Sequence, residues 1–184
     1  MKKIKKQIKN WVEEFIIGLN LCPFAKKPWQ FGRVRIKIVE SAIEEELTRV
    51  LLEELSALVN AKRDDLETTL LVALNMFATF EDFLVYLNWT EDLLKEIDAE
   101  GLIQIVGFHP DYYFEGAGKD DHANFTNRSP YPVLHLIREE SIDEAVRSYP
   151  NIEEIPKRNI ELLRKMKLED LKKYVNGKND AKGA

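Results

Sequence analysis

The chain has 184 residues, a length that suits one domain, and 45% of them are hydrophobic, which is enough for a sizeable core. Its net charge of -5 argues against a general nucleic-acid binder, because neutralising phosphates requires clustered positive charge. No run of about 18 apolar residues and no signal-peptide pattern occurs, so we expect a cytoplasmic protein without a membrane span.

The N-terminal segment predicts an amphipathic helix. Apolar residues repeat at helical spacing from residue 3 to residue 17, and Gly18 is a plausible stop. The first turns are crowded by lysines, namely Lys2, Lys3, Lys5, Lys6 and Lys9. We interpret them as the solvated face of the helix, and the alternative is a surface for a membrane or a partner. Residues 19–29 contain two prolines and no period, which predicts a loop.

Two strands with a helix between them should follow. Residues 34–39 alternate between apolar and mostly basic side chains, which predicts a strand with one wetter face near a sheet edge. Ser41 and Glu44 have the spacing of a capping box, before a helix that ends near Asn60. The continuous apolar run 68–74 predicts a strand that is covered on both faces.

The next helix should begin at a cap formed by Thr79 and Asp82 and end at Gly101. Residues 102–108 and 133–137 are again mostly apolar, and they predict a third and a fourth strand.

The C-terminal third predicts helices only. Ser141 with Glu144 should cap a short helix that stops by Pro150, and Pro156 suits the first turn of a final helix. Residues 168–175 either extend that helix or form a separate segment.

This order of elements predicts a single α/β domain over residues 1–175, with a mixed, mainly parallel four-stranded sheet flanked by helices. Helices join the first three strands, which favours parallel pairing through right-handed crossovers. The fourth strand follows a loop, so an antiparallel direction is open to it. Residues 176–184 are small and polar, and we expect a flexible tail.

The connection between the third and fourth strands is the strongest functional signal. It has about 24 residues, well beyond the usual loop length, and ordered long loops usually carry function. All three histidines lie in the stretch that contains it: His109, His122 and His135. His109 directly follows a strand, where ligands of open α/β sheets bind; the alternative is a structural histidine that caps a turn. His122 lies in a polar part of the loop, and we expect it to be exposed.

Three residues are candidates for catalysis: His109, His135 and Cys22. His135 shares a sheet face with Val133 and Ile137, so it belongs either to a pocket or to the core with its hydrogen bonds satisfied. Cys22, the single cysteine, is either a nucleophile with a lowered pKa or a small buried side chain.

The second half of the loop suits an anion. Arg128 stands among amide and hydroxyl groups, and a guanidinium binds carboxylate or phosphate through paired hydrogen bonds. The alternative is an arginine that holds the loop by bonding backbone carbonyls. The candidate substrate-binding residues are Arg128, Asn127, Asn124 and Ser129.

Metal and cofactor signals are weak. Cys22, His109 and His135 offer sulfur and nitrogen ligands for zinc or iron, but the chain has no short chelating spacing such as Cys-x-x-Cys. It also lacks the Walker A, dinucleotide-binding and Gly-x-Ser-x-Gly patterns. We therefore predict no metal ligand and leave the cofactor unknown.

Several motifs together resemble a known family: Leu19-Asn20-Leu21-Cys22-Pro23-Phe24-Ala25, Glu67-Thr68-Thr69-Leu70-Leu71-Val72, Phe108-His109-Pro110-Asp111-Tyr112, Asn127-Arg128-Ser129-Pro130-Tyr131-Pro132 with His135 and Arg138-Glu139, and Ile155-Pro156 with Arg158-Asn159. On these residues the chain resembles the bacterial domain-of-unknown-function family 1415, over nearly its whole length apart from the polar tail. The resemblance implies that Cys22, His109, Arg128 and His135 belong to the family signature. It implies no reaction.

Two hypotheses follow. In the first, the protein is a small-molecule enzyme that acts on an anionic substrate in a cleft formed by the loop 109–132. Arg128 would hold the anion, His109 or His135 would move a proton, and Cys22 would be a nucleophile or part of the wall. In the second, it is a metal-binding or interaction protein without catalytic activity. The sequence leaves open whether the protein is an enzyme and which oligomer it forms.

Overall fold

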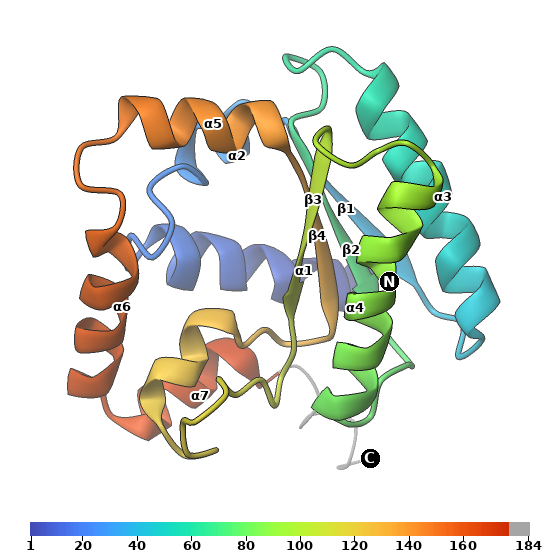
Figure 1. Ribbon diagram of the computed structural model, residues 1–184. Helices are drawn as coiled ribbons and strands as arrows, with labels where there is room; N and C mark the ends of the chain where they lie inside the picture. Colours follow the sequence, from blue (N-terminus) through green and yellow to red (C-terminus); the bar gives the residue numbers. More distant parts are fainter. Residues whose placement is uncertain (177–184) are drawn as a thin grey trace.

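Stretches rich in aliphatic and β-branched residues form the four strands of one sheet, in a computed structural model that describes residues 1–176 (Figure 1). They are β1 (Val34–Val39), β2 (Thr68–Ala73), β3 (Ile103–Phe108) and β4 (Val133–Arg138). The order across the sheet is β1-β2-β4-β3. β1 runs parallel to β2, whereas β4 is antiparallel to both β2 and β3. The α/β fold is confirmed, and the prediction that the sheet is mainly parallel is wrong, because only one pair is parallel.

The burial of the strands explains why β4 separates β2 from β3. Every residue of β2 is buried, and β4 is buried except at His135 and Ile137, which are half-buried. β3 exposes Gln104, and β1 exposes Arg35. An interior strand loses solvent on both faces, so the two strands without an exposed residue take the interior positions and the other two lie at the edges.

One face of the sheet is covered by α3 (Glu44–Asn60) and α4 (Phe80–Glu96) (Figure 1). Their apolar residues, such as Leu51 and Phe83, pack with Leu71, Leu134 and Leu136 of the sheet.

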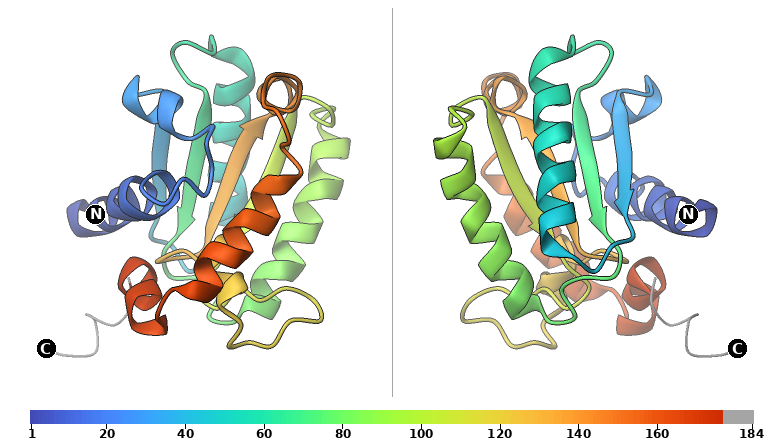
Figure 2. Two further views of the ribbon diagram at one scale, coloured as in Figure 1. Left: turned by 90° about the vertical axis from the view of Figure 1, so that its left-hand side faces the viewer. Right: turned by 90° about the vertical axis from the view of Figure 1, so that its right-hand side faces the viewer.

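The opposite face is covered by helices from both ends of the chain (Figure 2). α1 (Lys2–Asn10) continues into the π-helix η1 (Trp11–Ile17), and it packs with α6 (Glu154–Lys165), α7 (Leu168–Val175) and the short 3-10 helix η2 (His122–Asn127). The core on this face includes Ile8, Phe15, Val72, Val133, Leu163 and Leu171. Two further helices, α2 (Lys26–Gln30) and α5 (Glu139–Ser148), complete the molecule.

Some helix starts follow the predicted caps and others do not. The Thr79 hydroxyl accepts a hydrogen bond from the Asp82 N–H at 3.1 Å, which confirms the cap of α4. The Ser41 hydroxyl instead accepts from the Ile43 N–H, and α3 begins without a side-chain cap, so the capping box at Ser41 is wrong. Ser141 does not cap α5 either, because its hydroxyl donates to the Glu67 carboxylate at 2.7 Å. A charged acceptor makes a stronger hydrogen bond than a backbone group.

The remaining boundaries differ in detail. α5 begins at Glu139, directly after β4, and α4 ends at Glu96 rather than at Gly101. The segment predicted as a loop contains α2, and residues 168–175 form a helix of their own. The stop after residue 17 and the place of Pro156 in the first turn of α6 are confirmed. Of the flexible tail expected at residues 176–184, residues 177–184 lie outside the described residues.

No helix within residues 1–176 combines the length and the apolar character that crossing a bilayer requires.

Candidate functional site

His109 is fully buried on the sheet face that α4 covers, and both of its ring nitrogens are engaged. Nε2–H donates to the carbonyl of Phe77 at 2.9 Å, and Nδ1 accepts the backbone N–H of Asp111 at 3.1 Å. The tautomer follows from these partners, because a carbonyl can only accept and an amide N–H can only donate. The rings of Phe80 and Phe83 lie 5.8 Å and 5.4 Å from the imidazole. These contacts fix the start of the long loop against α4.

The guanidinium of Arg128 is directed at the backbone of its own loop. Nε donates to the carbonyl of Tyr112 at 2.9 Å and Nη2 to that of Lys119 at 2.8 Å, and the group lies over the Phe125 ring at 4.7 Å. Burial lowers the pKa of Arg128. The Arg128 carbonyl accepts the indole N–H of Trp11 at 3.1 Å, which ties the loop to η1. This is the loop-holding arrangement that the sequence offered as the alternative to anion recognition.

The other predicted binding residues also make contacts within the loop. Buried Asn124 accepts the Phe114 N–H at 3.1 Å and donates to the Gly118 carbonyl at 2.9 Å. The hydroxyl of Ser129 donates to the Tyr131 carbonyl at 2.5 Å. The backbone carbonyl of Asn127 accepts the His109 N–H at 3.2 Å. Each of these residues holds one part of the connection against another.

Asp121 fastens the same loop to α6. Its carboxylate accepts the Ala123 N–H at 2.9 Å, which starts η2, and accepts Nε and Nη2 of Arg164 at 3.1 Å and 2.6 Å. The hydrogen bond from Arg164 is the main reason why the pKa of Asp121 is lowered to about 2. His122 is half-buried, with its ring 6.5 Å from that of Phe125, so it is less exposed than expected.

His135 lies on the opposite face of the sheet from His109. Its Nε2 is 2.8 Å from the hydroxyl of Thr68, which itself donates to the Leu136 carbonyl at 2.5 Å. Because the Thr68 proton is used in that bond, Nε2–H of His135 donates and Nδ1 carries the lone pair. Burial lowers the pKa of His135 to about 4, so the imidazole is neutral at physiological pH.

Cys22 is half-buried in the turn that follows η1. Burial raises the pKa of its thiol, and hydrogen bonds from the backbone of Phe24 and Ala25 act in the opposite direction with smaller effect. The turn is held by α6, because the side chain of Asn159 donates to the Leu21 carbonyl at 2.7 Å. The thiol therefore sits in a fixed environment that favours its neutral form.

The structure separates His109 from the other two predicted catalytic residues. Phe80 and Phe83, which lie beside His109, belong to the core under α4. Phe108, which lies beside His135, and Leu21, which precedes Cys22, belong to the core on the opposite face. Within residues 1–176, no three His, Cys, Asp or Glu side chains gather in a way that could hold a metal ion.

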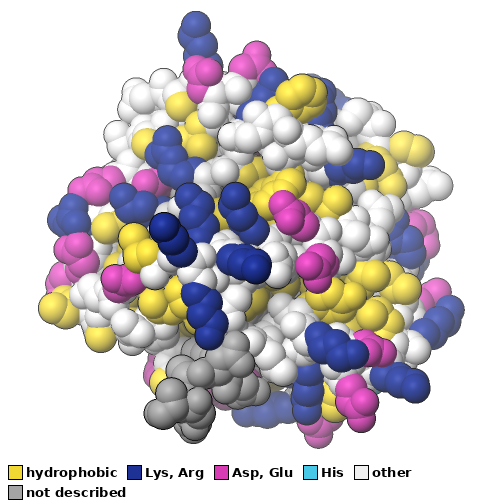
Figure 3. Space-filling model, turned by 180° about the vertical axis from the view of Figure 1, so that it is seen from behind, with side chains coloured by type: hydrophobic (Ala, Val, Ile, Leu, Met, Phe, Trp, Pro, Cys, Tyr) yellow, Lys and Arg dark blue, Asp and Glu magenta, His cyan; other side chains and the backbone are white. Residues whose placement is uncertain are grey.

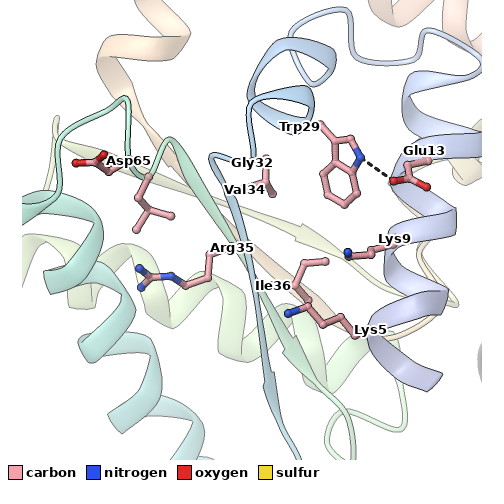
Figure 4. Close-up of a pocket in the computed structure, with 10 residues that line it drawn as sticks. Lys5, Lys9, Glu13, Trp29, Gly32, Val34, Arg35, Ile36 and Asp65 are labelled. Atoms are coloured by element: carbon pink, nitrogen blue, oxygen red, sulfur yellow. Dashed lines mark hydrogen bonds between the residues drawn. The ribbon is translucent and has the colours of Figure 1, made fainter. Parts of the chain in front are cut away.

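A hollow of about 500 Å³ lies beside β1, the edge strand next to α1 (Figure 4). We call it the α1/β1 groove. It is lined by Lys5, Lys9, Glu13, Trp29, Gly32, Val34, Arg35, Ile36, Asp65 and Leu66. α1 and η1 form one wall, α2 contributes the tryptophan, and the half-buried side chains of Val34 and Ile36 form the floor.

The charges in the α1/β1 groove are unevenly distributed. The side chains of Lys5 and Lys9 point from α1 toward Ile36 (Figure 4), and no carboxylate within residues 1–176 lies within ion-pair distance of either. The carboxylate of Glu13 accepts the indole N–H of Trp29 at 2.9 Å. The two ammonium groups are therefore open to an anion, and Glu13 marks the opposite end of the helical stripe.

The surface around α1 is basic as a whole. All five lysines of α1 are exposed. Lys and Arg side chains gather around a hydrophobic area on the side of the molecule where α1 lies (Figure 3). The lysine face of α1, which the sequence predicts to be solvated, thus borders a hollow. The helical spacing of the lysines does not by itself reveal this.

A sequence model of one protein family matches residues 3–173. The chain belongs to the DUF1415 family. The description of this family is a protein of unknown function, and the match confirms the resemblance seen in the motifs. No curated protein and no solved structure matches the chain.

Two motifs of the DUF1415 resemblance meet in space. The Leu19–Ala25 motif follows η1, and the Arg158-Asn159 motif lies in α6. The Arg158 guanidinium donates to the Asn20 carbonyl, next to the bond from Asn159 to Leu21. Through these two contacts, α6 positions the turn that carries Cys22.

The sequence patterns of this DUF1415 protein do not single out the residues that line the α1/β1 groove. Lys5 and Lys9 are spaced by one helical turn, and residues 34–39 predict an edge strand, so both signals were present. The link between them is tertiary, because it depends on where α1 crosses the sheet.

Proposed function

We propose that this protein binds an anionic ligand in the α1/β1 groove. The observation that carries the proposal is the pair Lys5 and Lys9, whose ammonium groups point into one hollow with no carboxylate partner within residues 1–176. The volume of about 500 Å³ falls in the range of roughly 300–1,000 Å³ that is typical of small-molecule sites.

The distribution of charge gives the ligand an orientation. Glu13 lies one turn beyond Lys9, so it repels an anionic group at that end and leaves Lys5 and Lys9 to bind it. The indole of Trp29, held by Glu13, offers a flat apolar wall for a neutral part of the ligand. A carboxylate or phosphate attached to an uncharged body suits this arrangement.

The narrower hypothesis places an anionic substrate in a cleft formed by the loop 109–132. Its contacts give that location less support, because Arg128 and Asn124 donate to carbonyls of the loop itself. Cys22 and His135 stay candidates for chemistry on a bound ligand, since they lie on the same sheet face as the groove. The non-catalytic alternative, an interaction protein, is equally compatible with a basic groove.

The test compares lysines of one helix. Calorimetric titration with phosphate, succinate, glutarate and citrate should show binding that weakens at least about tenfold in the Lys5→Ala/Lys9→Ala double variant, the equivalent of about 1.4 kcal/mol. Lys6→Ala is the matched control, because Lys6 is exposed on α1 but does not line the groove.

Equal weakening by Lys6→Ala would reduce the effect to general surface charge. Binding that is lost in Arg128→Lys and kept in the double lysine variant would move the site back to the long loop.

A further inference from the structure

The outer edge of β1, beside the α1/β1 groove, carries backbone N–H and carbonyl groups that face away from β2. On the inner side, the carbonyls of Arg33 and Val39 accept hydrogen bonds from the N–H groups of Glu67 and Leu74. Successive backbone groups of a strand point in opposite directions within the sheet plane. The outward groups of β1 are therefore those of Val34, Ile36 and Ile38.

These outward groups border the groove, and the described residues offer them no hydrogen-bond partner. No hydrogen bond within residues 1–176 reaches the N–H or carbonyl groups of Val34, Ile36 or Ile38 on that side. Val34 and Ile36 also line the groove together with Lys5 and Lys9. An open row of donors and acceptors on an edge strand is a template for a further strand.

We propose that the ligand of the α1/β1 groove is an extended acidic segment of a partner protein, which pairs with β1 as an added edge strand. The inference rests on the proposed function, that the groove takes an anionic ligand. Backbone hydrogen bonds to β1 supply affinity in this mode of recognition, and the flanking side chains supply selectivity.

Charge selects an acidic occupant. Side chains of an added strand alternate between its two faces, and both faces of β1 carry cations. Lys5 and Lys9 lie on the α1 side, and Arg35 and Lys37 lie on the α3 side, where they contact Glu54 at 3.0 Å and 3.7 Å. Acidic side chains of the added strand are therefore favourable on the α1 side. They are tolerated on the α3 side, where Glu54 already pairs with the cations.

The same charges disfavour a second copy of this chain as the occupant. Pairing of β1 with another β1 would bring Arg35 and Lys37 of one copy beside those of the other. Like charges opposite each other destabilise strand pairing. A partner with the opposite charge avoids this repulsion.

The first measurement uses the unaltered protein. A capped hexapeptide of alternating valine and glutamate should bind at least about tenfold more tightly than glutarate, by fluorescence anisotropy or calorimetry. The same peptide with every backbone amide N-methylated keeps its charges but cannot donate to β1. It should bind at least about tenfold more weakly than the parent peptide.

The second measurement changes β1. Ile38→Pro removes an outward N–H while the hydrogen bonds to β2, which come from the alternate residues, remain; proline is tolerated at such edge positions. It should abolish peptide binding and leave glutarate binding intact, because Ile38 does not line the groove. Ile38→Ala is the matched control, because it loses the side chain but keeps the N–H, and it should keep both ligands.

Each outcome is decisive. Equal binding of the parent and methylated peptides would overturn strand addition and leave the proposal of anion binding intact. Binding of glutarate without binding of the peptide would have the same meaning. If neither glutarate nor the peptide binds, both proposals fail. Self-association that Ile38→Pro abolishes, measured by light scattering, would identify a second copy as the occupant and overturn the acidic partner. If Ile38→Pro does not fold, the two peptides still decide on the unaltered protein.

Discussion

Polar side chains in the long connection between β3 and β4 form hydrogen bonds with the backbone around them. Arg128, Asn124 and Ser129 each donate to a main-chain carbonyl of that connection, and His109 donates to one just before α4. A long segment with little regular structure leaves many backbone groups without ladder partners, and buried groups of this kind need substitutes. These side chains supply them, which is why residue types typical of binding sites cluster here.

Arg128→Lys tests this at the residue scale. A lysine cannot reach the carbonyls of Tyr112 and Lys119 with a planar fork, so the free energy of unfolding should fall by about 1–3 kcal/mol. Urea unfolding measures it, with Arg147→Lys as the control at an exposed arginine. Anion binding should be unchanged. Unchanged stability combined with lost anion binding would restore recognition as the role of Arg128.

Cys22 should react slowly. Because burial raises the pKa of its thiol, little thiolate exists near neutral pH, and the thiolate is the reactive form. Iodoacetamide should therefore alkylate the folded protein more slowly than the same chain unfolded in urea, across pH 6 to about 9. A folded protein that reacts faster than the unfolded chain at neutral pH would make Cys22 a nucleophile after all.

At the scale of elements, the contact between β3 and α4 depends on a missing side chain. A Cβ at Gly107 would lie 2.5 Å from Leu87 and 2.8 Å from Phe83, both on α4. Gly107→Ala should lower the free energy of unfolding by about 1–3 kcal/mol, as overpacking of a core usually does. Gly118→Ala is the control, because a Cβ there meets nothing within 4 Å. Equal melting temperatures for the two variants would show that α4 can move away at no cost.

The elements themselves were largely predictable, because their signals are local. The apolar run of β2 and the cap at Thr79 each depend on neighbouring residues, and both predictions agree with the structure. Ser41 and Ser141 have the same spacing signal as Thr79, but nearby groups offered them other partners. The prediction of a mainly parallel sheet was wrong for a related reason, since strand pairing depends on which strand loses solvent on both faces. Gln104 in β3 was the available clue to an edge position.

The residues of the candidate site were harder to predict than the fold. Histidine, arginine and asparagine in a long loop are residue types that predict a binding site. Their identity alone does not show whether their side chains bond to a ligand or to backbone carbonyls. The α1/β1 groove brings Lys5 and Ile36 together from different elements. No local pattern encodes that contact.

At the scale of the whole molecule, His135 should couple stability to pH. Its pKa is lowered from 6.5 to about 4 in the folded state, so the unfolded chain binds the proton more readily between these values. The stabilisation is complete above about pH 6.5, decreases as the pH falls, and levels off below about pH 4. The loss should be about 1–3 kcal/mol, because the residue as a whole is only half-buried.

Urea unfolding between about pH 4 and 7.5 measures this effect. His135→Gln keeps a donor for Thr68 but does not titrate, so it should flatten the dependence. An unchanged slope in His135→Gln would assign the pH dependence to other groups.

The central position of β4 also has a consequence for how the protein is made. Among the described strands, β3 pairs only with β4, and β2 has β4 on one side, so a nascent chain that ends before Val133 holds one parallel pair and leaves β3 without its neighbour. The last residue of β4 then closes the structure, because Arg138 donates to the carbonyls of Leu58 at 2.5 Å, Ala61 at 2.8 Å and Leu66 at 3.1 Å. The sheet therefore cannot close before β4 has been synthesised, and the order of translation leaves β2 without its β4 neighbour until then.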